Sequence, residues 1–163
     1  AKINERGLVQ LVGRKKEIMK TSGGKMIAPT PIEEKIKQAD FVAQACLVGD
    51  GRKYVTALVT VAEEYLNNLK SKPGAIVDGI VRDKDFCLKI QERISEVNAE
   101  LASFEQVKYV TILGKDFSIE SGELTPTMKM KRNVVEKNYK DLIDKMYSSN
   151  ARETACPLDV AAE

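Results

Sequence analysis

An apolar stripe with helical spacing runs through the middle of the chain. Its residues recur at intervals of three or four positions: Phe86, Ile90, Ile94, Val97, Leu101 and Phe104. This spacing places all of them on one face of a helix, which we predict over residues 85–103. Because such a face is stable only when it is buried against another layer, the rest of the chain must supply that layer.

Runs rich in β-branched residues supply the layer as strands. Residues 41–48 and 54–61 predict a β-hairpin, because residues 49–53 between them combine glycine and aspartate as tight turns require. Residues 107–113 predict another strand, and two short strands are expected over residues 7–13 and 14–20.

Three further helices are expected to cover these strands. Thr30 should cap a helix that runs to about Gln38, because Pro31 suits the first helical position and Glu33 completes a capping box. Two others are expected over residues 62–70 and 132–147.

Residues 117–131 show no clear periodicity and contain Pro126, which predicts a loop. Taken together, the segments predict an α+β fold, in which a β-hairpin and a small, mostly antiparallel sheet pack with three to four helices. The length of 163 residues suits one such domain.

The composition excludes several classes of functional site. The chain has 26 basic and 24 acidic residues, so its net charge gives no general attraction to nucleic acid or to an anionic membrane. It has no histidine, which excludes Ser–His and Cys–His nucleophilic sites and histidine-ligated metals within this chain. Its three cysteines lack metal-ligand spacing, and there is neither a bilayer-spanning apolar run nor a secretory leader. We therefore expect a cytoplasmic location.

Three segments combine cations with turn formers. Residues 13–25 place lysines beside a glycine-rich loop, whose backbone N–H groups can approach an anionic ligand closely. Residues 49–53 place two cations on a tight turn, and residues 124–132 deliver lysines just ahead of a helix. Each segment taken alone is better explained as a surface turn or basic run bearing solvated charges.

In combination these segments resemble a known family. Residues 13–18 (GRKKEI), 21–29 (TSGGKMIAP) and 31–33 (PIE) look like the hinge and hairpin of the adenylate-forming superfamily. Residues 49–54 (GDGRKY) and 122–129 (GELTPTMK) resemble its long-chain acyl-CoA synthetase branch. The order and distances fit the C-terminal domain of that branch, and the resemblance covers about Asn4 to Tyr147.

The resemblance implies a two-step activity. A fatty acid attacks the α-phosphate of ATP to give acyl-adenylate and pyrophosphate, and the sulfur of coenzyme A then displaces AMP. The small C-terminal domain of such enzymes rotates between the two steps. The partner implied is the large N-terminal domain of the same polypeptide, which carries the ATP-phosphate loop and the fatty-acid tunnel.

From the same resemblance we expect residues 1–147 to be the lid domain, with hinge and hairpin in residues 1–20, and residues 148–163 to be a weakly ordered tail. ATP, coenzyme A and Mg2+ would be used by the full-length enzyme, whereas the isolated chain would bind none of them and turn nothing over. Peripheral attachment of the full-length enzyme to a membrane is left open.

The resemblance also assigns residues. Lys129 occupies the place of the adenylation lysine, and Lys129 with Arg132 matches the Lys-x-x-Arg ending of that motif. Met128 stands where much of the superfamily has glycine, and Lys131 is the alternative to Lys129. The remaining assignments are the hinge residues Lys16 and Arg14, the pantetheine-loop residues Ser22, Gly23 and Gly24, and the coenzyme A phosphate candidates Arg52 and Lys53.

The sequence also allows two alternative functions. The basic run 129–132 could serve a small nucleic-acid-binding module, although the neutral charge balance and the 6% aromatic content speak against it. The second alternative is a related adenylate-forming activity on medium-chain or aryl acids. The Leu-Thr-Pro-Thr segment at residues 124–127 favours the long-chain branch over this activity.

Overall fold

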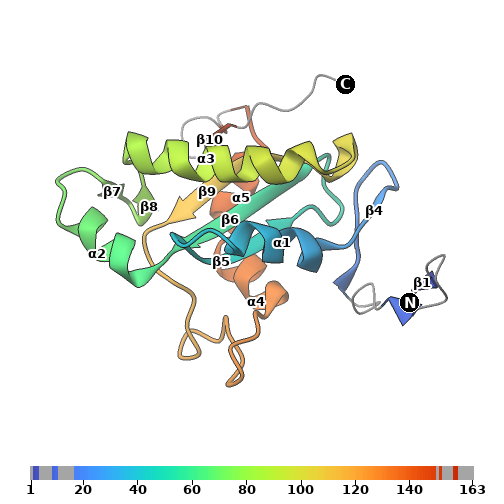
Figure 1. Cartoon of the computed structure of the whole chain (residues 1–163), viewed down its shortest axis with the longest axis horizontal. Coiled ribbons are helices and arrows are strands. Elements are labelled where there is room, and N and C mark those ends of the chain that lie inside the picture. Colours follow the sequence, from blue (N-terminus) through green and yellow to red (C-terminus); the bar gives the residue numbers. More distant parts are fainter. Residues whose placement is uncertain (1, 4–8, 11–16, 150, 152–155, 158–163) are drawn as a thin grey trace.

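The computed structural model describes residues 2–3, 9–10, 17–149, 151 and 156–157. Within these residues the predicted α+β class is confirmed. A six-stranded mixed sheet in the order β5-β6-β9-β8-β7, with β10 paired to β9, forms the centre of the described part (Figure 1).

The predicted hairpin forms the first pair of strands in this sheet. Strands β5 (Val42–Val48) and β6 (Val55–Val61) pair antiparallel, with Cys46 opposite Leu58. The predicted strand β9 (Val107–Leu113) pairs parallel to β6. A parallel pair needs a crossover connection, which is provided here by α2 (Glu63–Lys70) and α3 (Lys84–Ala99).

Three short strands complete the sheet and were not predicted. Strands β7 (Ile76–Val77) and β8 (Ile80–Val81) form a small hairpin, and β8 pairs with Leu113 of β9. Strand β10 (Cys156–Pro157) pairs antiparallel with β9 from within the segment that we expect to be a weakly ordered tail. The domain boundary at residue 147 stays a prediction.

The predicted helices are present, with corrected ends. Helix α1 (Pro29–Lys37) begins after Ala28 and has no side-chain cap, so the expected Thr30 N-cap and its capping box with Glu33 are wrong. Helix α3 ends at Ala99, and residues 103–105 form a separate 3-10 turn.

The expected helix over residues 132–147 is divided in two. Helices α4 (Arg132–Asn138) and α5 (Lys140–Met146) meet at Tyr139, whose φ of −109° and ψ of 22° interrupt the helical path. The apolar side predicted for this segment does face the core, because Val135, Ile143 and Met146 are all buried.

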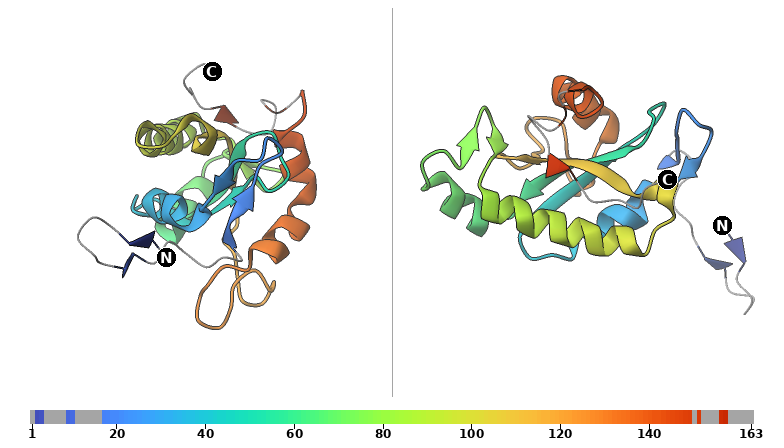
Figure 2. Two further views of the ribbon diagram at one scale, coloured as in Figure 1. Left: turned by 90° about the vertical axis from the view of Figure 1, so that its right-hand side faces the viewer. Right: turned by 90° about the horizontal axis from the view of Figure 1, so that it is seen from above.

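The sheet has a hydrophobic core on each face, because successive strand residues point to opposite sides. One core includes Leu47, Val59 and Ile112 together with residues of α1, α2 and α3. The other includes Cys46, Leu58 and Leu113 together with residues of α4, α5 and the loop before α4. The left view of Figure 2 shows the sheet between these two groups of helices.

Two small hairpins precede the sheet. Strands β1 (Lys2–Ile3) and β2 (Val9–Gln10) pair antiparallel, as do β3 (Met19–Lys20) and β4 (Met26–Ile27). The strands predicted over residues 7–13 and 14–20 therefore correspond in part to β2 and β3, and their other residues include 7–8 and 11–16, which lie outside the described residues. In the part that the structure describes, no helix is both long and apolar enough to cross a lipid bilayer.

Candidate functional site

The lysine loop, defined here as residues 117–131, places Lys129 in a tight turn. The backbone N–H of Thr125 donates to the carbonyl of Lys129 at 2.7 Å, and the N–H of Lys129 donates to the Thr125 hydroxyl at 3.0 Å. The N–H of Met128 also donates to the Thr125 carbonyl at 2.8 Å. The backbone of Lys129 is therefore held at two points, while its side chain is exposed.

The turn requires an unusual backbone at the residue before the lysine. Met128 has a φ of 63°, in the left-handed region that favours glycine. This conformation gives a physical reason why glycine is common at that position in the superfamily that the sequence resembles. The Met128 side chain costs nothing in crowding, because it is 57% exposed.

The base of the lysine loop is fixed to the domain. Phe117 and Leu124 are buried at 3% and 2% exposure in the core beneath α4 and α5. Leu124 forms an isolated β-bridge with Met130, and the N–H of Lys131 donates to the carbonyl of Glu123 at 2.8 Å. The loop is thus a hairpin with an anchored base and an exposed tip, and Lys131 lies nearer the base than Lys129.

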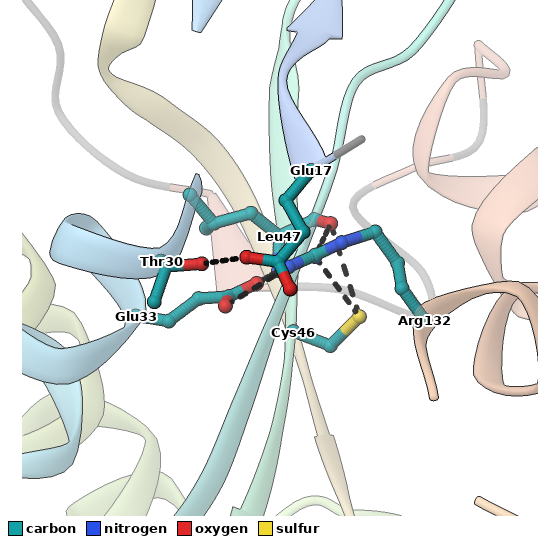
Figure 3. Close-up of polar contacts among 6 residues, drawn as sticks. All are labelled: Glu17, Thr30, Glu33, Cys46, Leu47 and Arg132. Carbon is teal, nitrogen blue, oxygen red and sulfur yellow. Dashed lines mark hydrogen bonds and ion pairs between the residues drawn. The ribbon is translucent and has the colours of Figure 1, made fainter. Parts of the chain in front are cut away.

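Arg132, the first residue of α4, ties this base to the opposite side of the domain (Figure 3). Its guanidinium donates to both carboxylate oxygens of Glu33, at 2.5 and 3.0 Å. The same group donates to the carbonyl of Leu47 at 2.8 Å and lies 3.6 Å from the Cys46 sulfur. We call this set of contacts the arginine clamp. It joins α4 to α1 and to β5.

Burial gives the arginine clamp its electrostatic character. The side chains of Arg132 and Glu33 are only 21% and 7% exposed. Burial lowers the pKa of Arg132, but the hydrogen bonds and negative charge of Glu33 outweigh this and raise it above its usual value. Burial also raises the pKa of the Cys46 thiol to about 12, so that this cysteine stays neutral beside the ion pair.

The predicted pantetheine loop is the turn between β3 and β4. Thr21 closes it, because its hydroxyl accepts from the N–H of Lys25 at 3.2 Å and its carbonyl accepts from the N–H of Gly24 at 2.9 Å. Gly24 has a φ of +84°, which a residue with a Cβ rarely adopts. Ser22, Gly23 and Gly24 are all exposed.

This loop lies against the turn that joins β5 to β6. The N–H of Ser22 donates to the carbonyl of Arg52 at 2.8 Å, and the N–H of Gly51 donates to the carbonyl of Lys20 at 2.8 Å. The N–H of Lys20 also donates to the carboxylate of Asp50 at 3.0 Å. Two of the three segments singled out from the sequence therefore form one continuous surface.

The two phosphate candidates on that surface differ in their surroundings. The guanidinium of Arg52 donates to Asp144 at 2.7 Å and lies 4.9 Å from the centre of the Tyr147 ring. The Arg52 side chain therefore already contacts Asp144 of α5 and Tyr147, which follows α5, whereas the side chain of Lys53 is exposed.

The predicted residues thus fall into two groups. One group lies at and beside the β3–β4 turn and consists of Ser22, Gly23, Gly24, Arg52 and Lys53. The other is Lys129 at the tip of the lysine loop, which projects from another side of the sheet (Figure 1). The hinge candidates Lys16 and Arg14 lie outside the described residues.

The role of Glu33 escaped sequence reasoning. Its spacing from Thr30 indicated a capping box, but Glu33 lies on the same side of α1 as the buried residues Pro29 and Ile36. A carboxylate within an apolar stripe is rarely stable without a buried partner. That position was the available signal, although the identity of the partner, 99 residues away, could not be read from it.

Comparisons with known proteins give consistent results. Residues 16–151 match the protein family described as AMP-binding enzyme C-terminal domain. The long-chain-fatty-acid–CoA ligase FadD15 of Mycobacterium tuberculosis is 34% identical over 150 residues, which cover 90% of this chain and 25% of that protein. The long-chain-fatty-acid–CoA ligase ACSBG2 of Gallus gallus is 38% identical over 168 aligned positions, with 90% and 22% coverage. The chain spans about a quarter of the length of these curated relatives.

Solved structures share the fold. The adenylation domain of a carboxylate reductase from Mycobacterium chelonae superimposes with a TM-score of 0.67 at 24% identity, over 83% of this chain and 20% of that one. The ATP-bound MatB of Rhodopseudomonas palustris gives a TM-score of 0.52 at 25% identity, over 86% of this chain and 23% of that one. The nucleic-acid-binding alternative has no support in the family or in these relatives.

Proposed function

Because this chain belongs to the AMP-binding enzyme C-terminal domain family, we propose that it is the rotating lid domain of a long-chain fatty acid–CoA ligase. The curated relatives at 34% and 38% identity carry that activity in their names and extend well beyond the region that this chain matches. We further propose that the lid acts together with a large adenylation domain of the same polypeptide.

The observation that carries the proposal is the lysine loop. Lys129 is an exposed cation at the tip of a hairpin whose base is anchored in the core. A fatty-acid carboxylate and ATP repel each other as anions, and an ammonium group held between them lowers that repulsion as the carboxylate oxygen bonds to the α-phosphorus and pyrophosphate leaves. Lysine suits this role because it is a compact charge on a long stem.

The surface around the β3–β4 turn supports the second step. Its exposed loop of Ser22, Gly23 and Gly24 offers backbone without side-chain obstruction to the pantetheine arm of coenzyme A. Of the two phosphate candidates Arg52 and Lys53, Lys53 is the one free of an ion pair with α5, since Arg52 is already paired with Asp144. Rotation of the lid would present this surface in place of the lysine loop after the adenylate has formed.

The proposal assigns ATP, coenzyme A and Mg2+ to the full-length ligase. Among the described residues, no group of three or more Cys, Asp or Glu side chains could hold a metal ion. We therefore assign no described residue to Mg2+, which would enter bound to ATP and supply further charge neutralisation at the phosphates.

A direct assay tests the proposal. The full-length protein that carries this domain is incubated with ATP, Mg2+, coenzyme A and fatty acids of increasing length, and acyl-CoA, AMP and pyrophosphate are measured. We expect all three products in equal amounts with long-chain acids, and none from the purified 163-residue chain. Activity confined to medium-chain or aryl acids would favour the neighbouring ligases, and turnover by the chain alone would contradict the assignment as a lid.

A further inference from the structure

The arginine clamp contains the most heavily bonded charged side chain at the base of the lysine loop. All the partners of the Arg132 guanidinium in the clamp, namely Glu33, Cys46 and Leu47, come from α1 and β5. The clamp therefore fixes the C-terminal end of the lysine loop to the sheet and to α1. The N-terminal end of the loop is fixed separately, by Phe117 and Leu124 in the core.

We infer that Arg132, clamped by Glu33, is a positioning residue that sets where the Lys129 ammonium stands during adenylation. This inference rests on the proposed function, because it needs Lys129 to be the adenylation lysine. Arg132 itself is turned into the domain and contacts Glu33, so its effect on the reaction passes through the backbone that joins it to Lys129.

Geometry explains why a distant clamp matters to the lysine. Three residues of extended chain from Arg132 reach at most about 10 Å, so a 10° tilt of this segment about the clamp displaces the backbone of Lys129 by up to about 2 Å. Displacements of about 1 Å at a reacting group can cost about 100-fold in rate. The two planar N–H···O bonds between Arg132 and Glu33 resist such a tilt, because they fix orientation as well as distance.

Helix α1, which carries Glu33, also contacts the segment that follows the predicted hinge. The hydroxyl of Thr30, one turn before Glu33 on α1, donates to the carboxylate of Glu17 at 3.1 Å (Figure 3). Glu17 directly follows the hinge candidate Lys16 in the sequence. Helix α1 thus contacts both the base of the lysine loop, through Glu33, and the chain next to the hinge candidate, through Thr30.

Four variants of the full-length ligase test the inference. Arg132→Lys keeps the charge but loses the two-pronged bond, and the double variant Glu33→Leu/Arg132→Met replaces the buried pair by apolar groups that can pack. Glu100→Gln is the matched control, because it breaks the exposed 2.7 Å pair between α1 residue Lys35 and Glu100. Lys129→Ala tests the underlying assignment of the lysine.

Each variant is assayed for fatty-acid-dependent ATP–pyrophosphate exchange, for thioester formation from pre-made acyl-adenylate and coenzyme A, and for Tm. We expect both clamp variants to lower kcat of exchange by about 10- to 100-fold while thioester formation changes less than about twofold. The Glu100→Gln control should change neither reaction. A merely structural role would instead lower both reactions together, in step with Tm.

Other results would overturn the inference. A folded double variant that exchanges at the wild-type rate would show that the lysine needs no clamp, and if that variant does not fold, unchanged exchange by Arg132→Lys would show the same. Loss of exchange in Lys129→Ala with normal exchange in the clamp variants would refute the positioning role alone. Normal exchange in Lys129→Ala would refute the lysine assignment and the inference with it.

Discussion

Replacing Glu33 by alanine should cost the isolated 163-residue chain about 3–5 kcal/mol of unfolding free energy. The reason is that Arg132 is only 21% exposed and would keep its charge without its carboxylate partner. Domains of this size have about 5–15 kcal/mol in total. A loss of that magnitude lowers Tm by about 6–20 °C, at about 2–4 °C for each kcal/mol.

Urea unfolding followed by circular dichroism at pH 7 measures this cost, provided that a second probe gives the same transition. The double variant Glu33→Leu/Arg132→Met should recover to within about 1 kcal/mol of the parent, because replacing both charges removes their desolvation penalty. If Glu33→Ala costs less than about 1 kcal/mol, as an exposed pair would, then Arg132 is solvated and the arginine clamp cannot hold the lysine loop.

Three further changes test other parts of the structure. Burial raises the pKa of the Glu136 carboxyl, so the folded state binds a proton there more tightly than the unfolded state, and the free energy of unfolding falls as the pH rises through that pKa. Glu136→Gln should therefore stabilise the chain at pH 7 but not at pH 4, and urea unfolding that shows no such difference would contradict this. Iodoacetamide at pH 8 should label Cys156 before Cys46 in the folded chain, because a hydrogen bond with the Cys87 thiol lowers the pKa of Cys156 while burial raises the pKa of Cys46 to about 12. Equal labelling of the two cysteines, measured by mass spectrometry, would refute this order. Gly114→Ala should cost about 1–3 kcal/mol, because a Cβ there would lie 2.7 Å from Ile76 Cγ2, and an unchanged urea midpoint would show that the β7–β8 hairpin yields freely.

Elements with strong local signals could be predicted from the sequence. The β5–β6 hairpin follows from turn formers between two β-branched runs, and α3 follows from its apolar stripe. Strands β7, β8 and β10 have two residues each, which is too short for an alternating pattern to appear. The break at Tyr139 is likewise invisible locally, because the apolar spacing continues through it.

The candidate site shows the same division. The Lys129 loop and the Ser22–Gly24 loop were found from motifs whose residues are adjacent in the sequence. The contacts that support them join distant segments, as when Arg132 meets Glu33 or when Arg52 meets Asp144, 92 residues away. Glu33 was misread because its spacing from Thr30 fitted a local cap, whereas tertiary burial decided its partner.

The role of Lys129 in the full-length ligase is central to the proposed function. Lys129→Ala should lower fatty-acid-dependent ATP–pyrophosphate exchange by about 100- to 1,000-fold, as expected when a group that stabilises developing charge is removed. Thioester formation from pre-made acyl-adenylate should survive, since we propose that the surface around the β3–β4 turn serves that step. If exchange survives in Lys129→Ala but is lost in Lys131→Ala, the lysine is misassigned. If Lys129→Ala lowers both half-reactions equally, a lid that presents Lys129 for adenylation alone is contradicted.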